Sequence, residues 1–323
     1  MSKKEKSNYI LRRVGIQTEH FKKNVGIVFL ENINNQDEWS PNLNFEQDAC
    51  SYFLLQMNPV QDIFDFQIVT PFFDEYYTQD QFKKEFSVPV VTSYHKKSAA
   101  ERRKLENWFN KIIGTIQKYS KAMDIDYWMF ITSEQLSLNW NFCNNDSKTA
   151  WLITSHAWQR SYSPPSLFEY LAITIFTCSL YALALEFDRK DHNSHYSSTK
   201  GCIFDFTRHK PFRRILVSNP QICMDCLNHF NHIQQTIVVQ TQKQVDLVSS
   251  IERVLDSGWI GTKENKNSPH FILKKNYGFD LNENSGFNKT LKEKIRDFIM
   301  EHQILSLIVT VIGTVLAVAG IIS

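Results

Sequence analysis

The chain has 323 residues, of which 42% are hydrophobic and 13% aromatic, and its formal net charge is +2. This composition indicates a globular chain with enough apolar surface for a packed core. Because basic and acidic residues are interspersed, the sequence predicts no binding surface for nucleic acid. Residues 1–23 begin with the polar run MSKKEKS, which lacks the apolar stretch of a secretory signal, and we assign them to a tail and lead-in.

Short apolar runs alternate with helical patterns in the N-terminal half of the chain. Strands are expected at 25–30, 64–70, 127–132 and 150–154, and helices at 45–57 and 98–121. Strands that are separated by helices favour an α/β fold over a helical bundle. We therefore predict a mixed sheet with flanking helices.

A capping box, Ser166-x-x-Glu169, directly precedes an apolar helix that is expected to end near residue 187. No charged residue lies between Tyr170 and Leu185, so this helix is expected to be buried on nearly every side. A membrane span is the alternative. Because sixteen uncharged residues that include three Ser or Thr are short and polar for a span, we predict a central core helix.

Histidines and cysteines gather after this helix, in the order His192, His195, Cys202, Cys223 and Cys226. Zinc takes four nitrogen or sulfur donors at tetrahedral corners, and a Cys-x-x-Cys turn supplies two thiolates. We predict one Zn²⁺ bound by His195, Cys202, Cys223 and Cys226, with His192 as the alternative to His195. Four protein ligands leave no position for water, so the site is predicted to be structural. The alternative is that Cys202 is a buried apolar residue in a strand-like run and that the cysteine pair is incidental.

The C-terminal quarter is expected to hold a helix at 226–256 and then polar connecting segments. A second capping box, Thr290-x-x-Glu293, begins a juxtamembrane helix. The predicted units are the tail (1–23), the α/β domain (24–260) with its zinc module (192–226), a linker (261–289), and the juxtamembrane helix with an anchor (290–323).

Residues 304–322 form a run of nineteen residues without a charge. At about 1.5 Å per residue, this length matches the hydrocarbon core of a bilayer. We predict a single-pass, tail-anchored protein with the lipid bilayer as a partner; a buried core helix is the alternative. The basic residues just before the span favour a cytoplasmic globular part. Small residues four positions apart in the span would allow two such helices to associate, so a homo-oligomer is a further expectation.

The order of these features resembles that of a known family. Strands that end at Ile131-Thr132-Ser133 and Ile153-Thr154-Ser155 precede the buried helix, and Cys202 lies twenty-one residues before the Cys-x-x-Cys pair. This order resembles the archaemetzincin-type metallopeptidases, in which a helix carries HExxHxxGxxH and a later cysteine cluster binds a structural zinc. The resemblance covers about residues 24–230 and implies a metzincin-like fold.

The catalytic motif of that family is missing, because no HExxH occurs in the 323 residues. Glu169 stands where the general base of the family would stand, but the zinc histidines on either side would be Phe168 and Ala172. Two imidazoles one helical turn apart are needed to hold a catalytic zinc on a helix. The resemblance therefore implies a chain that kept the scaffold and the structural metal and lost the peptidase chemistry.

We therefore expect a non-enzymatic protein whose cytoplasmic domain binds an unknown protein or small-molecule ligand. Such a domain would serve as a sensor, a binding module or a membrane effector, for instance in bacterial defence. The alternative is a membrane-bound zinc peptidase or hydrolase with a rearranged site at Glu169, Asp191, His192 and His195. Asp205 is expected near the zinc, as a hydrogen-bond partner of its histidine.

Overall fold

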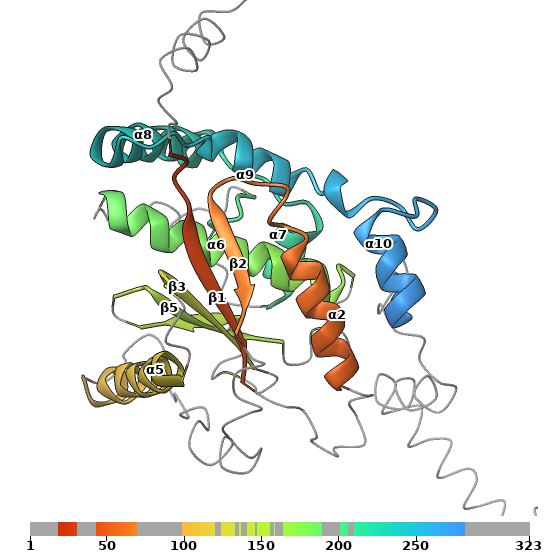
Figure 1. Ribbon diagram of the computed structural model, residues 1–323, viewed down its shortest axis with the longest axis horizontal. Helices are drawn as coiled ribbons and strands as arrows, with labels where there is room; N and C mark the ends of the chain where they lie inside the picture. The colour runs from red at the N-terminus through yellow and green to blue at the C-terminus, as the bar shows by residue number, and fades with distance from the viewer. Residues whose placement is uncertain are drawn as a thin grey trace, which may run out of the picture.

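The computed structural model describes residues 19–30, 43–69, 99–119, 124–132, 136, 141–145, 147–155, 158, 164–188, 201–205 and 210–281. His192 and His195, the juxtamembrane helix and the apolar run at 304–322 lie outside these residues. Within them, one five-stranded sheet has helices on both faces (Figure 1). The predicted α/β fold with a mixed sheet and flanking helices is confirmed.

The sheet has four parallel strands and one antiparallel edge strand. Its strands are β1 (Lys23–Phe29), β2 (Phe64–Ile68), β3 (Tyr127–Thr132), β4 (Phe142–Asn144) and β5 (Ala150–Thr154), in the order β2-β1-β3-β5-β4. Strand β4 pairs with β5 in the antiparallel direction, with Cys143 opposite Leu152. The central strands are apolar on both faces, as expected for parallel strands that are covered on both sides. The predicted strands at 127–132 and 150–154 are confirmed at both ends.

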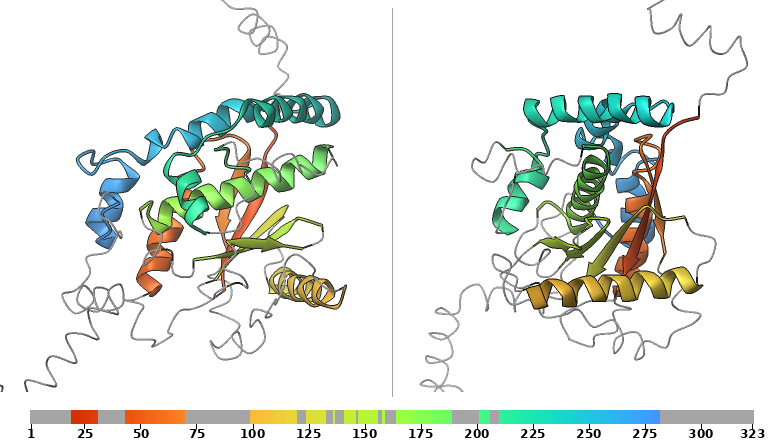
Figure 2. Two further views of the ribbon diagram at one scale, coloured as in Figure 1. Left: turned by 180° about the vertical axis from the view of Figure 1, so that it is seen from behind. Right: turned by 90° about the vertical axis from the view of Figure 1, so that its left-hand side faces the viewer.

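Alternate residues of each central strand face different helices. In β1, Val25 and Ile27 belong to the apolar cluster on the side of α6 (Leu167–Asp188), and Val28 belongs to the cluster on the other side. That second cluster is closed by α5 (Ala99–Tyr119), whose apolar stripe packs on the sheet. Figure 2 shows α5 on one side of the sheet and α6 on the other.

Helix α6 is the centre of the larger apolar cluster. It contacts β3 and β5, α2 (Leu43–Leu55), α7 (Lys210–Ser218) and α8 (Met224–Thr241). Within the described part of the chain, α6 alone is long and apolar enough to cross a membrane, and 89% of its most apolar window is buried inside the protein. The structure therefore places it as the predicted core helix.

The predicted helix at 226–256 is two helices, α8 and α9 (Leu247–Leu255). The chain turns at Gln242, which has a left-handed φ of 57°. The next residues pair with the N-terminal lead-in, because the Phe21 amide donates to the Gln244 carbonyl at 2.9 Å. Phe21 and Gln244, which this hydrogen bond joins, lie more than 200 residues apart in the sequence.

The folded body extends beyond the predicted boundary at residue 260. A 3-10 turn η4 (Gly258–Ile260) leads to α10 (Pro269–Ile272) and the π-helical turn η5 (Leu273–Tyr277). Leu273 and Phe279 are buried, and the ring of Phe279 lies 5.0 Å from that of Phe168 on α6. Residues 269–281 thus pack on the domain rather than forming part of a linker.

Candidate metal centre

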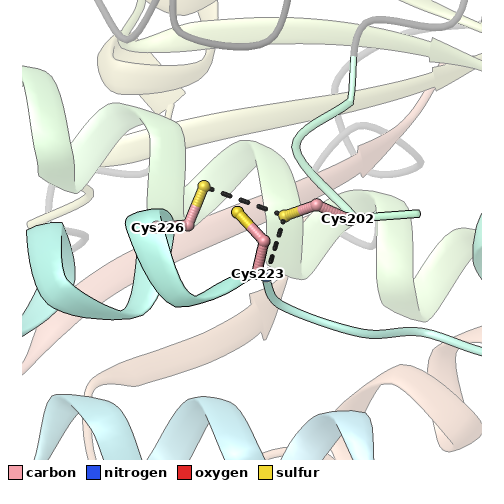
Figure 3. Close-up of side chains that lie close together, drawn as sticks. All are labelled: Cys202, Cys223 and Cys226. Atoms are coloured by element: carbon pink, nitrogen blue, oxygen red, sulfur yellow. Dashed lines mark hydrogen bonds between the residues drawn. The ribbon is translucent and has the colours of Figure 1, made fainter. Parts of the chain in front are cut away.

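Three cysteine sulfur atoms meet at the start of α8 (Figure 3). Cys202 lies in a turn at 201–205, Cys223 is the N-cap residue of α8, and Cys226 lies in its first turn. The Sγ atoms of Cys202 and Cys226 are 3.7 Å apart, and all three Sγ atoms lie within 4.8 Å of one another. A tetrahedral centre with zinc–sulfur bonds of about 2.3 Å separates its sulfurs by about 3.8 Å. The cluster therefore has the dimensions of a thiolate metal site.

The segment that carries Cys202 is a compact turn, and the strand-like reading of this run is wrong. The Cys202 amide donates to the Asp205 carboxylate at 3.0 Å, and the Asp205 amide donates back to the Cys202 carbonyl at 2.8 Å. The amide of Ile203 donates to the carbonyl of Gln221, just before α8. Asp205 thus binds the backbone of a cysteine and shapes the turn. Its predicted contact with a zinc-bound histidine involves His192 or His195, which lie outside the described residues.

The other two cysteines owe their positions to the N-terminus of α8. A Cys-x-x-Cys spacing places both side chains near the same end of a helix. Cys223 has extended backbone angles, as an N-cap residue does, and its amide donates to the Cys202 sulfur at 3.4 Å. Free amides and the helix dipole make this end favourable for thiolates.

The cysteine cluster is electrostatically prepared to hold a negative charge. A hydrogen bond between the thiols of Cys202 and Cys226 lowers the pKa of Cys202 to about 6, against the opposing effect of burial, with help from the amide of Cys223. The same hydrogen bond raises the pKa of Cys226. The pair thus favours a thiolate, the form that binds metal, on one of its two sulfurs.

The donor set fits a metal that prefers sulfur. Two of the three thiols are buried and the third, Cys223, is half-buried. No other histidine, cysteine or carboxylate of the described residues joins the group. His229 lies one turn beyond Cys226 but pairs with Asp188 at 3.4 Å. The predicted ligand His195 and its alternative His192 belong to residues 189–200, which the structure does not describe.

Glu169 has the structural role that its capping box predicts. Its carboxylate accepts hydrogen bonds from the amide of Ser166 at 2.8 Å and from the Ser166 hydroxyl at 2.6 Å. The flanking residues Phe168 and Ala172 are buried in the core. Asp191 of the alternative hydrolytic site lies outside the described residues. No metal-ligand group of three or more forms on α6 within the described residues.

No protein-family model matches this chain. A search among curated proteins also finds no match. The cysteine cluster is therefore the feature from which a function can be inferred, together with a buried arginine, Arg213, that sequence patterns did not single out. Arg213 is only 1% exposed and lies on α7, beside the turn that carries Cys202.

Proposed function

We propose that Cys202, Cys223 and Cys226 bind one structural Zn²⁺, with His195 or His192 as the fourth ligand, in a domain that binds a partner rather than catalysing a reaction. The observation that carries this proposal is the separation of 3.7 Å between the sulfurs of Cys202 and Cys226, which come from segments 24 residues apart. Soft thiolate donors favour zinc over magnesium or calcium. Four protein ligands would close the coordination sphere.

The place of the cluster in the fold supports a structural role. The turn at 201–205 follows the core helix α6, and α8 packs across α6. A metal held between the turn and the first turn of α8 would fasten two segments that cover the core. Binding free energy at such a site is folding free energy, because the unfolded chain has no preformed site.

The order of elements supports the proposal of a peptidase-like scaffold without peptidase chemistry. Parallel strands β3 and β5 lead to α6, and the cysteine cluster follows, which is the order on which the archaemetzincin resemblance rests. Glu169 is held by the cap of α6, and no zinc ligand accompanies it on that helix within the described residues. We infer a degenerate metzincin-like domain that serves as a sensor, binding module or membrane effector.

Metal content tests the proposal directly. The full-length chain, purified in detergent, should contain one zinc per chain, and Cys223→Ser and Cys226→Ser should each lose it and unfold or aggregate. Structural zinc sites contribute about 10–16 kcal/mol in zinc-finger peptides, more than a typical domain can lose. Cys178→Ala removes a buried thiol outside the cluster and is the matched control.

Four outcomes would contradict this assignment. A chain without bound metal, or a folded and stable Cys223→Ser/Cys226→Ser variant, would exclude a structural metal. A disulfide between two of the three cysteines in the purified protein would point to redox chemistry instead. A second, chelator-sensitive metal that accompanies peptide cleavage would favour the alternative peptidase or hydrolase.

We further propose that residues 304–322 anchor the domain in a lipid bilayer, with the domain in the cytoplasm. The uncharged run of nineteen residues supports this proposal. The full-length chain should sediment with membranes and resist extraction by alkaline carbonate. Arginine at a helix centre costs about 2.5–3.5 kcal/mol of insertion free energy, so Ile312→Arg/Leu316→Arg should release the chain. The control is Ile312→Leu/Leu316→Ile, and release by the control or retention of the arginine variant would refute the anchor.

A further inference from the structure

Arg213 carries a positive charge into the interior of the domain. Its guanidinium donates through Nη1 to the carbonyl of Ile203 at 2.8 Å and through Nη2 to the hydroxyl of Thr177 at 3.3 Å. It lies 5.9 Å from the ring centroid of Phe142 on β4. These three contacts, with a carbonyl, a hydroxyl and an aromatic ring, are all with uncharged groups.

No carboxylate of the described residues lies within ion-pair distance of this guanidinium, and its Nε atom is buried without a hydrogen-bond partner. Burial accordingly lowers the pKa of Arg213. A buried charge is retained in proteins when it is paired, because desolvation is otherwise uncompensated. The arrangement therefore calls for a negative charge nearby.

The cysteine cluster is the place where such a charge would form. Ile203, whose carbonyl binds the guanidinium, directly follows Cys202 in the turn. The thiol of Cys202 is also among the groups whose negative charge favours the protonated form of Arg213, after Cys178, Tyr170 and Tyr181. Burial raises the pKa of Cys178 and of Tyr170, so these two groups stay neutral. Tyr181 donates its hydroxyl proton to the Phe204 carbonyl at 3.1 Å, so it is neutral as well. Among the described residues, the cluster is then the source of negative charge.

Charge counting gives the sign and the size of that charge. Zinc brings two positive charges, three thiolates bring three negative charges, and a neutral histidine brings none. The loaded centre therefore has one net negative charge, equal and opposite to that of one arginine.

We propose that Arg213 is the counter-charge of the metal–thiolate centre that Cys202, Cys223 and Cys226 form. The inference rests on the proposed zinc site and adds a residue that tunes its affinity. It implies that Arg213 stabilises the metal-bound form more than the metal-free form. The loaded centre keeps its negative charge, whereas the metal-free cysteines can take up protons.

Metal affinity of Arg213 variants tests this role. Competition of the full-length protein with a chromogenic chelator should show that Arg213→Met weakens Zn²⁺ binding by about 10- to 100-fold, the usual effect of losing an outer-shell partner. Arg213→Gln keeps a donor for the Ile203 carbonyl without the charge, and it should weaken binding to a similar extent. Arg213→Lys keeps the charge and should bind zinc more tightly than either neutral variant.

A second measurement separates a counter-charge from a merely structural side chain. With the metal removed by a chelator, Arg213→Met should lose less resistance to urea than it loses in the metal-bound form, because the metal-free cysteines can take up protons when the cation is gone and the loaded centre cannot. Arg214→Met is the matched control, since Arg214 is the next residue and donates to the Pro164 carbonyl away from the cluster. It should leave zinc affinity unchanged.

The possible failures are distinct. If the wild type binds zinc and Arg213→Met binds it equally well, the counter-charge role is refuted and the metal site stands. If Arg213→Lys binds as weakly as Arg213→Met, or if Arg213→Met destabilises the metal-free protein as much as the metal-bound protein, hydrogen bonding or packing explains Arg213 instead. If the wild type binds no zinc, the proposed metal site itself is refuted, and this inference falls with it.

Discussion

The carboxylate of Glu169 accepts the hydrogen bonds of a helix cap. It accepts both from the amide and from the hydroxyl of Ser166, and its own amide donates to the Ser166 hydroxyl at 3.2 Å. All partners of the reciprocal capping box are therefore in place. The position that a family resemblance marks as catalytic is occupied here by a helix cap.

Substitution of this residue distinguishes the cap from a catalytic base. Glu169→Gln should change the free energy of unfolding little, because Gln also serves at this position of a capping box. Glu169→Ala should cost about 1 kcal/mol through loss of the cap. Urea unfolding measures both variants, and Glu252→Ala, on an exposed part of α9, is the control. If the wild type cleaves peptides and a Glu169→Gln protein of equal stability does not, the purely structural role is contradicted.

Single residues also set the limit of what sequence can predict about the metal centre. The Cys-x-x-Cys spacing identified Cys223 and Cys226 because both lie in one local turn of α8. The contact between Cys202 and Cys226 could be expected from their type and order, and the structure brings them together. The burial of Arg213 could not be expected, because it depends on α6, β4 and the turn at once.

Among the elements, α6 matters most to the stability of the domain. Its composition resembles that of a membrane span, yet its side chains contact the sheet on one side and α8 on the other. Phe176 is fully buried, and its ring meets that of Phe64 at a centroid distance of 5.9 Å. The helix therefore obtains from protein neighbours the apolar surroundings that a span obtains from lipid.

Truncation of a side chain on α6 tests this packing. Phe176→Ala should lower the free energy of unfolding by about 3–5 kcal/mol, because it leaves a cavity in a close-packed core. Val239→Ala on α8 is the control, since Val239 is 78% exposed and its loss should change stability by less than about 0.5 kcal/mol. Denaturant unfolding monitored by tryptophan fluorescence measures both. Equal effects of the two substitutions would refute a core position for α6.

Elements were predictable where the pattern is local and strong. The buried strands β3 and β5 are continuous apolar runs, and the first and last residue of each were predicted correctly. Strand β4 was missed because its three residues, Phe-Cys-Asn, lie in a polar segment, and it forms by pairing with β5. The break between α8 and α9 was missed; it contains the left-handed residue Gln242 and a bridge from Gln244 to His20 in the lead-in, which no local pattern reveals.

At the scale of the whole molecule, the domain is closed by a segment that the sequence pattern assigned to the linker. Residues 269–281 return to the body, where η5 contacts α2 and the rings of Tyr52 and Tyr277 stack at 5.9 Å. The buried carboxylate of Asp280 contacts His270 at 3.0 Å and also pairs with Lys274. Leu281, the last described residue, belongs to the apolar cluster of the body.

Two shortened chains locate the boundary of the domain. A chain that ends at residue 281 should unfold cooperatively, whereas one that ends at residue 260 should be less stable by several kcal/mol. The physical reason is the loss of buried Leu273 and Phe279, each worth about 1.5–3 kcal/mol. Both chains lack residues 304–322, so urea unfolding compares them under equal conditions. Equal stability would support the predicted linker from residue 261 onward.

The burial of α6 has a consequence for the synthesis of this protein. A growing chain presents this helix, which has the length and apolarity of a membrane span, before the later helix α8 exists to cover it. Chaperones and insertion factors that recognise hydrophobic segments therefore meet α6 during that interval. The speed with which α8 docks after translation then decides how long α6 is exposed to insertion into a membrane.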